Sequence, residues 1–307
     1  MADFDVLVLG GAGVDTIVRV PELALPAGDY LPVPPIRDYV AHSGNGVALG
    51  FHALGLRTRF ADLLGDDAFG ALIQARYAAV GLDHVSIPAP NGTPRSVNLV
   101  DAAGRRFSFF DGRHPDGYRF PEDFYLPLVA RAAHVHVATD RTPAVWAAAR
   151  ERGITTSTDI HAWNGVDEWA WPMASEADIV FLSSASAPST IDDVMRAIAG
   201  KGRASVVVAT EGERGCRVLA DSTITRYPVA VPSRPVVDSN GAGDAFSTAF
   251  LSRWLGGRPL PECALAGAVS GAFACGAPGT HEELISSGAL AAGMAAASGT
   301  WGPRVSD

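Results

Sequence analysis

The sequence predicts an α/β fold: a mostly parallel β-sheet with helices on both faces, together with a small β lid. A continuous apolar run over residues 5–9 is typical of a strand that is covered on both sides. Between residues 134 and 209, apolar strand segments alternate with helical segments, which is the order of a parallel sheet. Two stretches, at about 15–40 and 93–113, are rich in β-forming residues and lack a helical period, so we expect them to form the lid.

The size and charge of the chain limit its class. Its 307 residues, 48% hydrophobic and 19% charged, suffice for one large α/β domain, which we expect to span 1–307. The formal net charge of −9, without any run of Lys or Arg, argues against a nucleic-acid partner.

Three widely spaced cysteines, Cys216, Cys263 and Cys275, indicate buried thiols in a reducing compartment rather than a disulfide framework or a zinc site. The acidic N-terminus leads directly into a strand and has no signal-peptide pattern. The most apolar late segment, 263–277, is too short to span a bilayer. We therefore expect a cytoplasmic protein that does not act at a membrane.

The first strand ends in a glycine-rich turn at 10–13. A dinucleotide-binding fingerprint would need a third glycine where Thr16 stands and a helix directly afterwards, and the chain shows neither pattern. A dehydrogenase is therefore disfavoured.

The remaining elements follow in order. The first lid stretch leads into a helix that begins near residues 44–48, then a strand at 58–61 and a helix from 65–70 to about residue 81. In the second lid stretch, 96–100 and 106–110 form the two strands of a predicted hairpin. The central segments are strands at 134–138, 154–159, 178–182 and 205–209, with helices ending near residue 150 and spanning 191–199.

The stretch 236–246 is the most informative part of the chain. An apolar pair leads into a glycine-rich turn, after which apolar residues recur at helical spacing. The small residues Gly241, Ala242 and Gly243 leave backbone N–H groups open at the positive end of a helix dipole, which makes an anion site. A carboxylate there, Asp244, is unfavourable unless it removes a proton from a hydroxyl that attacks the anion.

This turn, Asp-Ser-Asn-Gly-Ala-Gly-Asp-Ala-Phe, resembles the C-terminal motif of the ribokinase-like (PfkB-type) carbohydrate kinases, with Ser239 in place of Thr. The resemblance covers most of the chain and is strongest at 44–83 and 205–247. It implies a ribokinase-like fold and ATP-dependent phosphoryl transfer to a hydroxymethyl group of a sugar or sugar-like substrate. By this resemblance Asp244 is the general base, and the three small residues before it supply the amides that stabilise the transferring phosphoryl group.

The same resemblance implies the substrate-binding residues. Asp15 matches an acid that contacts sugar hydroxyls in many members of the family, and a carboxylate can accept two hydroxyl donors. The helix start contributes Gly44 and Asn45. The family's sugar-binding Asn falls at Gly46, so we expect Asn45, one place earlier, to substitute for it. The Gly-Gly pair that precedes it in the family is replaced by residues around His42.

On the nucleotide side, the turn after the strand at 205–209 resembles the family's Thr-x-Gly-x-x-Gly element. The resemblance implies contacts to ATP from Thr210, Gly212, Gly215 and Asn240. Magnesium would accompany the nucleotide, because in-line phosphoryl transfer normally needs Mg²⁺ to bridge the phosphates.

The predicted metal region departs from the family. The usual Asn-x-x-Glu, which organises magnesium and its waters, is replaced by Ser183 and Ser186. Asp159 ends a parallel strand and is the remaining carboxylate candidate for a metal. The resemblance places a monovalent cation, potassium, near Asp238. A nearby histidine pair, at 134 and 136, has no third ligand close in sequence, so we expect it to pack within the sheet.

We therefore predict an ATP-dependent carbohydrate kinase with a small-molecule sugar or nucleoside substrate, and a homodimer formed through the lid. A nucleoside kinase of the same fold is one alternative. A non-catalytic regulator that binds sugar or nucleotide is the other, favoured by the changes at Gly46, Ser183 and Ser186 and disfavoured by the intact Asp244.

Overall fold

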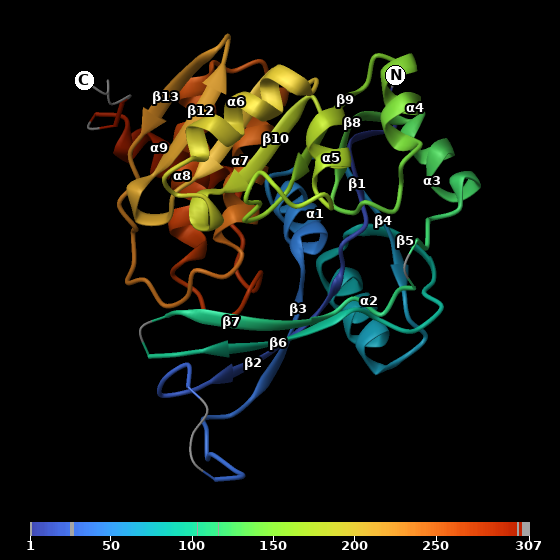
Figure 1. The fold of residues 1–307 in the computed structure, drawn as a ribbon, viewed down its shortest axis with the longest axis vertical. Coiled ribbons are helices and arrows are strands. Elements are labelled where there is room, and N and C mark those ends of the chain that lie inside the picture. Colours follow the sequence, from blue (N-terminus) through green and yellow to red (C-terminus); the bar gives the residue numbers. More distant parts are fainter. Residues whose placement is uncertain (1, 25–27, 103, 116, 300, 303–307) are drawn as a thin grey trace.

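The computed structural model describes residues 2–24, 28–102, 104–115, 117–299 and 301–302, arranged in two β-sheets with flanking helices (Figure 1). Parts of the two predicted lid stretches, residues 25–27 and Ala103, lie outside the described residues.

The larger sheet has nine strands in the order β13-β12-β11-β10-β9-β8-β1-β4-β5. Its neighbouring strands are parallel except at one edge, where β11, β12 and β13 pair antiparallel. The mostly parallel sheet predicted from the sequence is therefore confirmed. The strands are β1 (Phe4–Leu9), β4 (Thr58–Leu64), β5 (Asp83–Pro88), β8 (Ala132–Val137), β9 (Thr155–Asp159), β10 (Ile179–Ser183), β11 (Val206–Thr210), β12 (Cys216–Ala220) and β13 (Thr223–Tyr227).

Helices cover both faces of this sheet. One layer consists of α1 (Ser43–Ala53), α2 (Ala68–Val80), α7 (Ala242–Leu255) and α8 (Leu260–Ala274), with α9 (Ser287–Ala297) packed on α8. The other layer consists of α3 (Glu122–Val129), α4 (Val145–Glu151), α5 (Trp171–Glu176) and α6 (Ile191–Lys201). Alternate residues of β1 pack into the two layers. Val6 and Val8 pack into the layer with α1 and α7, whereas Leu7 and Leu9 pack into the layer with α3 to α6. This double burial explains the apolar run, which covers 6–9; the expected first residue, Asp5, is charged and pairs with Arg57.

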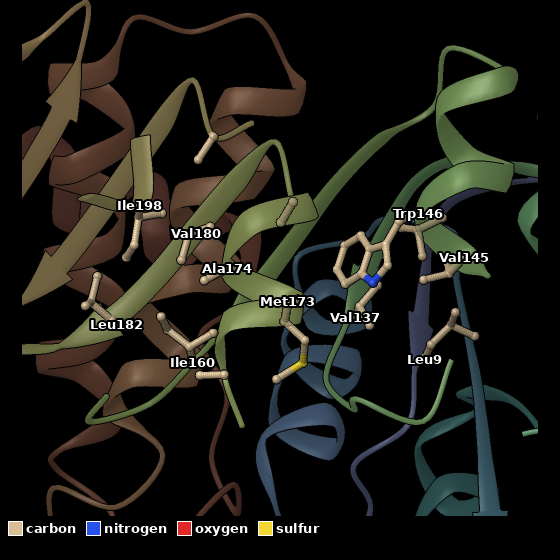
Figure 2. Packing of buried hydrophobic residues seen from close by; sticks show 14 of the residues in the cluster. Leu9, Val137, Val145, Trp146, Ile160, Met173, Ala174, Val180, Leu182 and Ile198 are labelled. Carbon is tan, nitrogen blue, oxygen red and sulfur yellow. The ribbon is translucent and has the colours of Figure 1, made fainter. Parts of the chain in front are cut away.

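Figure 2 shows the second layer from close by, with side chains of several helices meeting the strands. Trp146 of α4 and Met173 of α5 lie over the sheet near Val137 of β8, and all three are nearly or fully buried. A core of this density fixes the strand ends, and the carboxyl ends of parallel strands are where open α/β sheets carry their sites.

The second sheet contains β3 (Arg37–Ala41), β2 (Gly13–Arg19), β6 (Arg95–Val100) and β7 (Arg106–Asp111), in that order. The hairpin predicted in the second lid stretch is β6 and β7, and β6 pairs in parallel with β2. Because β1 passes through the turn at 10–13 directly into β2, this sheet lies at the carboxyl end of the larger one (Figure 1).

The described cysteines are free thiols, and burial raises the pKa of Cys216 and of Cys263 to about 12. Within the described residues, every helix is too short or too polar to cross a membrane.

Candidate active site

The site is organised around the start of α7. Gly241 precedes the helix with φ +73°, a left-handed conformation that favours glycine, and a Cβ there would overlap the carbonyl oxygen of Thr280. The first-turn N–H groups of a helix have no partner within it. Of these, the Ala242 N–H is 3.3 Å from the Ser239 carbonyl oxygen, and a Cβ at Gly243 would meet no atom within 4 Å. The helix end therefore offers amides beside open space, as an anion site requires.

Asp244 lies in this first turn, and its side chain is 16% exposed. Its backbone carbonyl accepts hydrogen bonds from the hydroxyls of Ser247 and Thr248. Its carboxylate Oδ2 lies 2.8 Å from Nε2 of His281. One carboxylate oxygen is thus held by the protein, beside the predicted anion site.

His281 was missed by the sequence reasoning. The residue follows α8 in a loop without helix or strand and is 4% exposed. It reaches Asp244 because Gly46 on α1 leaves room: a Cβ at position 46 would overlap the imidazole. One turn further along α1, Gly50 lets the helix approach α7, since a Cβ there would be 2.8 Å from the side chain of Thr248. A glycine inside a helix usually has such a packing reason, and that was the available signal.

Asn45 is buried and engaged within the protein, and its expected contact with the sugar stays a prediction. Its side chain is fully buried; its Nδ2 donates to the Val40 carbonyl oxygen and lies 3.0 Å from Nδ1 of His281, and its Oδ1 accepts from the Tyr77 hydroxyl. Gly44 also has a packing role, because a Cβ there would overlap the carbonyl oxygen of Gly10. Both residues hold the start of α1 against the core.

Asp15 lies on β2 of the second sheet and is 7% exposed. Its Oδ1 is 3.5 Å from Nε2 of His42, which is also 3.3 Å from the hydroxyl of Ser96. His42 has φ 71°, a rare conformation for a residue with a side chain, and its ring packs against Phe110 of β7. Hydrogen-bond donors and acceptors are therefore clustered between the second sheet and the start of α1. His42 and Ser96 belong to this cluster together with Asp15.

The loop before α7 is tied to the second sheet by two arginines. Asp238 accepts a hydrogen bond from Arg19 at 3.1 Å on Oδ2 and from the Asn240 N–H at 3.0 Å on Oδ1. Arg106 of β7 donates to the side-chain oxygen of Asn240. Because both carboxylate oxygens of Asp238 are engaged, a cation there would compete with Arg19. Asn240 likewise uses its side-chain oxygen on the second sheet, so this geometry supports neither a monovalent-cation role for Asp238 nor a nucleotide contact for Asn240.

The turn after β11 contains the other predicted nucleotide residues. The Thr210 hydroxyl lies 3.4 Å from the Leu182 carbonyl oxygen, and Gly212 is exposed with φ +59° and open space where a Cβ would lie. Gly215 has φ +95°, and a Cβ there would overlap the Tyr227 carbonyl oxygen. Gly215 is therefore required by the close approach of β13, whereas Gly212 leaves its backbone accessible.

Asp159 ends β9, and its Oδ1 accepts from the His161 N–H at 2.7 Å. Burial raises the pKa of its carboxyl, and the charge of Asp244 adds to this effect. Ser183 lies at the end of the neighbouring β10, where its N–H donates to the His161 carbonyl oxygen. No group of three His, Cys, Asp or Glu side chains in the described ranges is placed to hold a metal ion.

The histidine pair on β8 packs within the sheet, as predicted. His134 contacts the hydroxyls of Thr155 and Ser157 at 2.8 Å, and His136 contacts Ser157 at 2.9 Å. Burial lowers the pKa of His134 to about 3 and that of His136 to about 4, so both rings are neutral at neutral pH.

The chain is similar to known kinases over nearly its whole length. A family model for pfkB family carbohydrate kinases matches residues 6–286. The acarbose 7(IV)-phosphotransferase of Actinoplanes sp. is 45% identical over 290 residues, which cover 93% of this chain and 97% of that protein.

Solved structures agree with this. A microbiome-derived acarbose kinase superimposes with a TM-score of 0.88 at 43% identity, covering 95% of this chain and 99% of that one. Arabidopsis thaliana ribokinase, solved with ribose and ATP, gives a TM-score of 0.78 at 18% identity over 96% of this chain and 99% of its own, and so shares the fold. With the predicted motif at the start of α7, these matches show that the chain belongs to the pfkB family of carbohydrate kinases.

Proposed function

We propose that this ATP-dependent carbohydrate kinase is a cytoplasmic enzyme that phosphorylates acarbose or an acarbose-like sugar on a hydroxymethyl group. The observation that carries the proposal is the position of Asp244 in the first turn of α7, next to the open space at Gly243. The substrate class follows the 45% identity to the acarbose 7(IV)-phosphotransferase, which covers 97% of that relative.

In this proposal the free oxygen of Asp244 accepts the proton of the substrate hydroxyl. The hydroxyl oxygen then forms its bond to the γ-phosphorus of ATP as the bond to the bridging oxygen breaks, which releases ADP. The amides of Gly241, Ala242 and Gly243 stabilise the charge that grows on the phosphoryl oxygens. On the nucleotide side, Thr210, Gly212 and Gly215 form the turn that lines the phosphates of ATP.

Magnesium fits this site as a companion of the nucleotide. Mg²⁺ retains several waters and needs few protein ligands when phosphates supply the rest, which agrees with the absence of a three-ligand cluster among the described residues. When bound, it would neutralise the phosphate charge. We infer that Asp159 would hold its waters, because it is the carboxyl that ends β9 and the charge of Asp244 affects its pKa. Its register partner on β10 is Phe181, two residues before Ser183, which replaces the family Asn. Potassium near Asp238 would first have to displace Arg19.

We further infer that the chain forms one kinase domain over 1–307, with the second sheet as a lid on the sugar. The lid would contribute Asp15, and the start of α1 would contribute His42; Oδ1 of Asp15 is 3.5 Å from Nε2 of His42, whose ring packs against Phe110. Carboxylates and neutral imidazoles suit polyol recognition because they accept hydrogen bonds from hydroxyl groups in defined directions.

The substrate assignment is tested by ADP release from ATP in the presence of acarbose, ribose, fructose, adenosine or cytidine. We expect acarbose to have the highest kcat/KM of the five. Turnover with adenosine or cytidine alone would identify a nucleoside kinase. Binding of a sugar by calorimetry without any ADP release would identify a regulator instead.

The same experiment includes Asp15→Ala, with Asp38→Ala as a matched control on the exposed side of the lid. Loss of hydrogen bonds to a charged group should weaken the affinity for the accepted sugar by about 10–100-fold. The affinity for an ATP analogue should not change in either variant. Equal sugar affinity in Asp15→Ala and wild type would remove Asp15 from the sugar site.

We also infer that two copies associate through the lid. β7 is one of the two edge strands of that sheet, and its side chains Phe107, Phe109 and Phe110 are 56%, 58% and 70% exposed. An edge strand with exposed aromatic side chains can pair with the same strand of a second copy. Sedimentation equilibrium should therefore report twice the monomer mass, and Phe109→Ser should shift the protein toward the monomer. A wild-type monomer at every concentration would contradict this.

A further inference from the structure

The base Asp244 is the last member of a buried chain of hydrogen bonds. The chain runs from the Tyr77 hydroxyl to Oδ1 of Asn45 at 3.0 Å, from Asn45 Nδ2 to His281 Nδ1 at 3.0 Å, and from His281 Nε2 to Asp244 Oδ2 at 2.8 Å. Tyr77, Asn45 and His281 are each at most 4% exposed. Of these four side chains, only the Asp244 carboxylate reaches the predicted reaction centre.

The carbonyl of Val40 determines how the chain is oriented. A carbonyl oxygen only accepts, so the side of Asn45 that faces it at 3.2 Å must be the NH₂ group. The same NH₂ group faces His281, whose Nδ1 must therefore be the unprotonated acceptor. At the other side of Asn45, burial raises the pKa of Tyr77 well above its usual value, so the phenol keeps its proton and donates.

It follows that His281 carries its proton on Nε2, and this N–H donates a hydrogen bond to Oδ2 of Asp244. A doubly protonated imidazole would place an N–H at Nδ1 against the N–H of Asn45, and the network disfavours that form. His281 is therefore a neutral, fixed donor. It occupies Oδ2 and leaves the other oxygen of the carboxylate for the substrate hydroxyl.

Two glycines make the space for this imidazole. A Cβ at Gly46 of α1 would overlap Nε2, and a Cβ at Gly241 before α7 would be 2.8 Å from Cδ2. The ring is thus held between the helix that carries Asn45 and the turn that supplies the anion site. A side chain that is packed from two sides in this way has a fixed position, and it can therefore fix the orientation of the group to which it is hydrogen-bonded.

We propose that His281, held as the Nε2–H tautomer by Asn45, is a positioning residue that aims the carboxylate of Asp244 at the substrate hydroxyl. This rests on the proposed function of Asp244 as the base. Other groups also act on that carboxylate: Asp159 at the end of β9, which itself faces His161, and the buried His136 of β8. Of these neighbours, His281 is the one whose side chain contacts the Asp244 carboxylate directly, with Nε2 at 2.8 Å from Oδ2.

The test compares His281→Leu, which removes the donor, with His281→Gln, which keeps an N–H at the end of the side chain. In His281→Leu we expect kcat to fall about 10–100-fold, the loss of one hydrogen bond to a charged group, with KM for ATP unchanged. The acidic limb of the pH profile of kcat/KM should move to higher pH, because the carboxylate loses a stabilising donor. His281→Gln should recover most of kcat and return the limb toward its wild-type position.

His52→Leu is the matched control. This histidine, on α1, contacts the Val80 carbonyl oxygen away from the site, so its loss should move neither kcat nor the acidic limb. Wild-type kcat and an unmoved limb in His281→Leu would overturn the proposal. Equal losses in the Leu and Gln variants, with melting temperatures like the wild type, would overturn it too, because the donor would then not matter.

Gly46→Ala decides the matter if His281→Leu fails to fold. The added methyl should push the imidazole away from Asp244 and reduce kcat as His281→Leu would, whereas Gly200→Ala, in open space on α6, should not. Wild-type kcat in a folded Gly46→Ala would overturn the proposal. If Asp244→Asn were as active as the wild type, the assignment of Asp244 as the base would fail. If Asp244→Asn lost activity as expected while His281→Leu kept the wild-type kcat, only the positioning role of His281 would be rejected.

Discussion

Replacing Asp244 by Asn should lower kcat about 10²–10⁴-fold, the usual contribution of a general base, while ATP still binds. The reason lies in the contact with His281. The Asn side-chain oxygen can keep accepting the Nε2–H of that ring, which turns the NH₂ group toward the substrate. The reacting hydroxyl then faces a donor that cannot take its proton, although shape and packing are preserved.

Steady-state kinetics, together with calorimetry of an ATP analogue, measure this outcome. Asp83→Asn is the matched control, because Asp83 is an exposed acid paired with Arg59 at the start of β5. It should leave kcat unchanged. Activity of Asp244→Asn within a factor of two of the wild type would remove Asp244 from the base role, whichever sugar is the substrate.

The fold was predictable because each of its main features has a local sequence pattern. Residues 6–9 of β1 are apolar on both faces, and both faces are covered by helices. The hairpin at 96–110 is visible from its alternating strands. The turn at the start of α7 was predictable for the same reason, because its glycines and its acid are consecutive in sequence. Its role as an anion site stays a prediction.

The surroundings of the other candidate residues depend on contacts between distant segments, which the sequence alone does not show. Asn45 and Gly46 are adjacent in sequence but point about 100° apart around a helix. Asp238 looked free for a cation until the lid brought Arg19, 219 residues away, to its carboxylate. His281 has no motif of its own, and its role depends on the glycine at 46 that leaves it space.

Gly243→Ala should separate the chemistry of the anion site from its structure. Gly243 is the second residue of α7, and a Cβ there would meet no atom of the protein within 4 Å. Alanine is favoured over glycine in a helix by about 1 kcal/mol, so the melting temperature should stay level or rise. The methyl group would nevertheless enter the space where a phosphoryl oxygen must approach the first-turn amides. We expect kcat to fall about 10²-fold, comparable to the loss of one donor to a developing oxyanion.

The control is Gly288→Ala, at the second residue of α9, where a Cβ also meets open space. It should gain the same helix stability without any change in kcat. Gly241→Ala should behave differently from both, since its φ of +73° and the overlap with Thr280 should lower stability and activity together. A stable Gly243→Ala with wild-type kcat would mean that the phosphoryl group does not approach α7 at this residue. A stable but inactive variant would support a ligand in that open space, because no side chain or backbone of another described segment lies within 4 Å of a Cβ at this position.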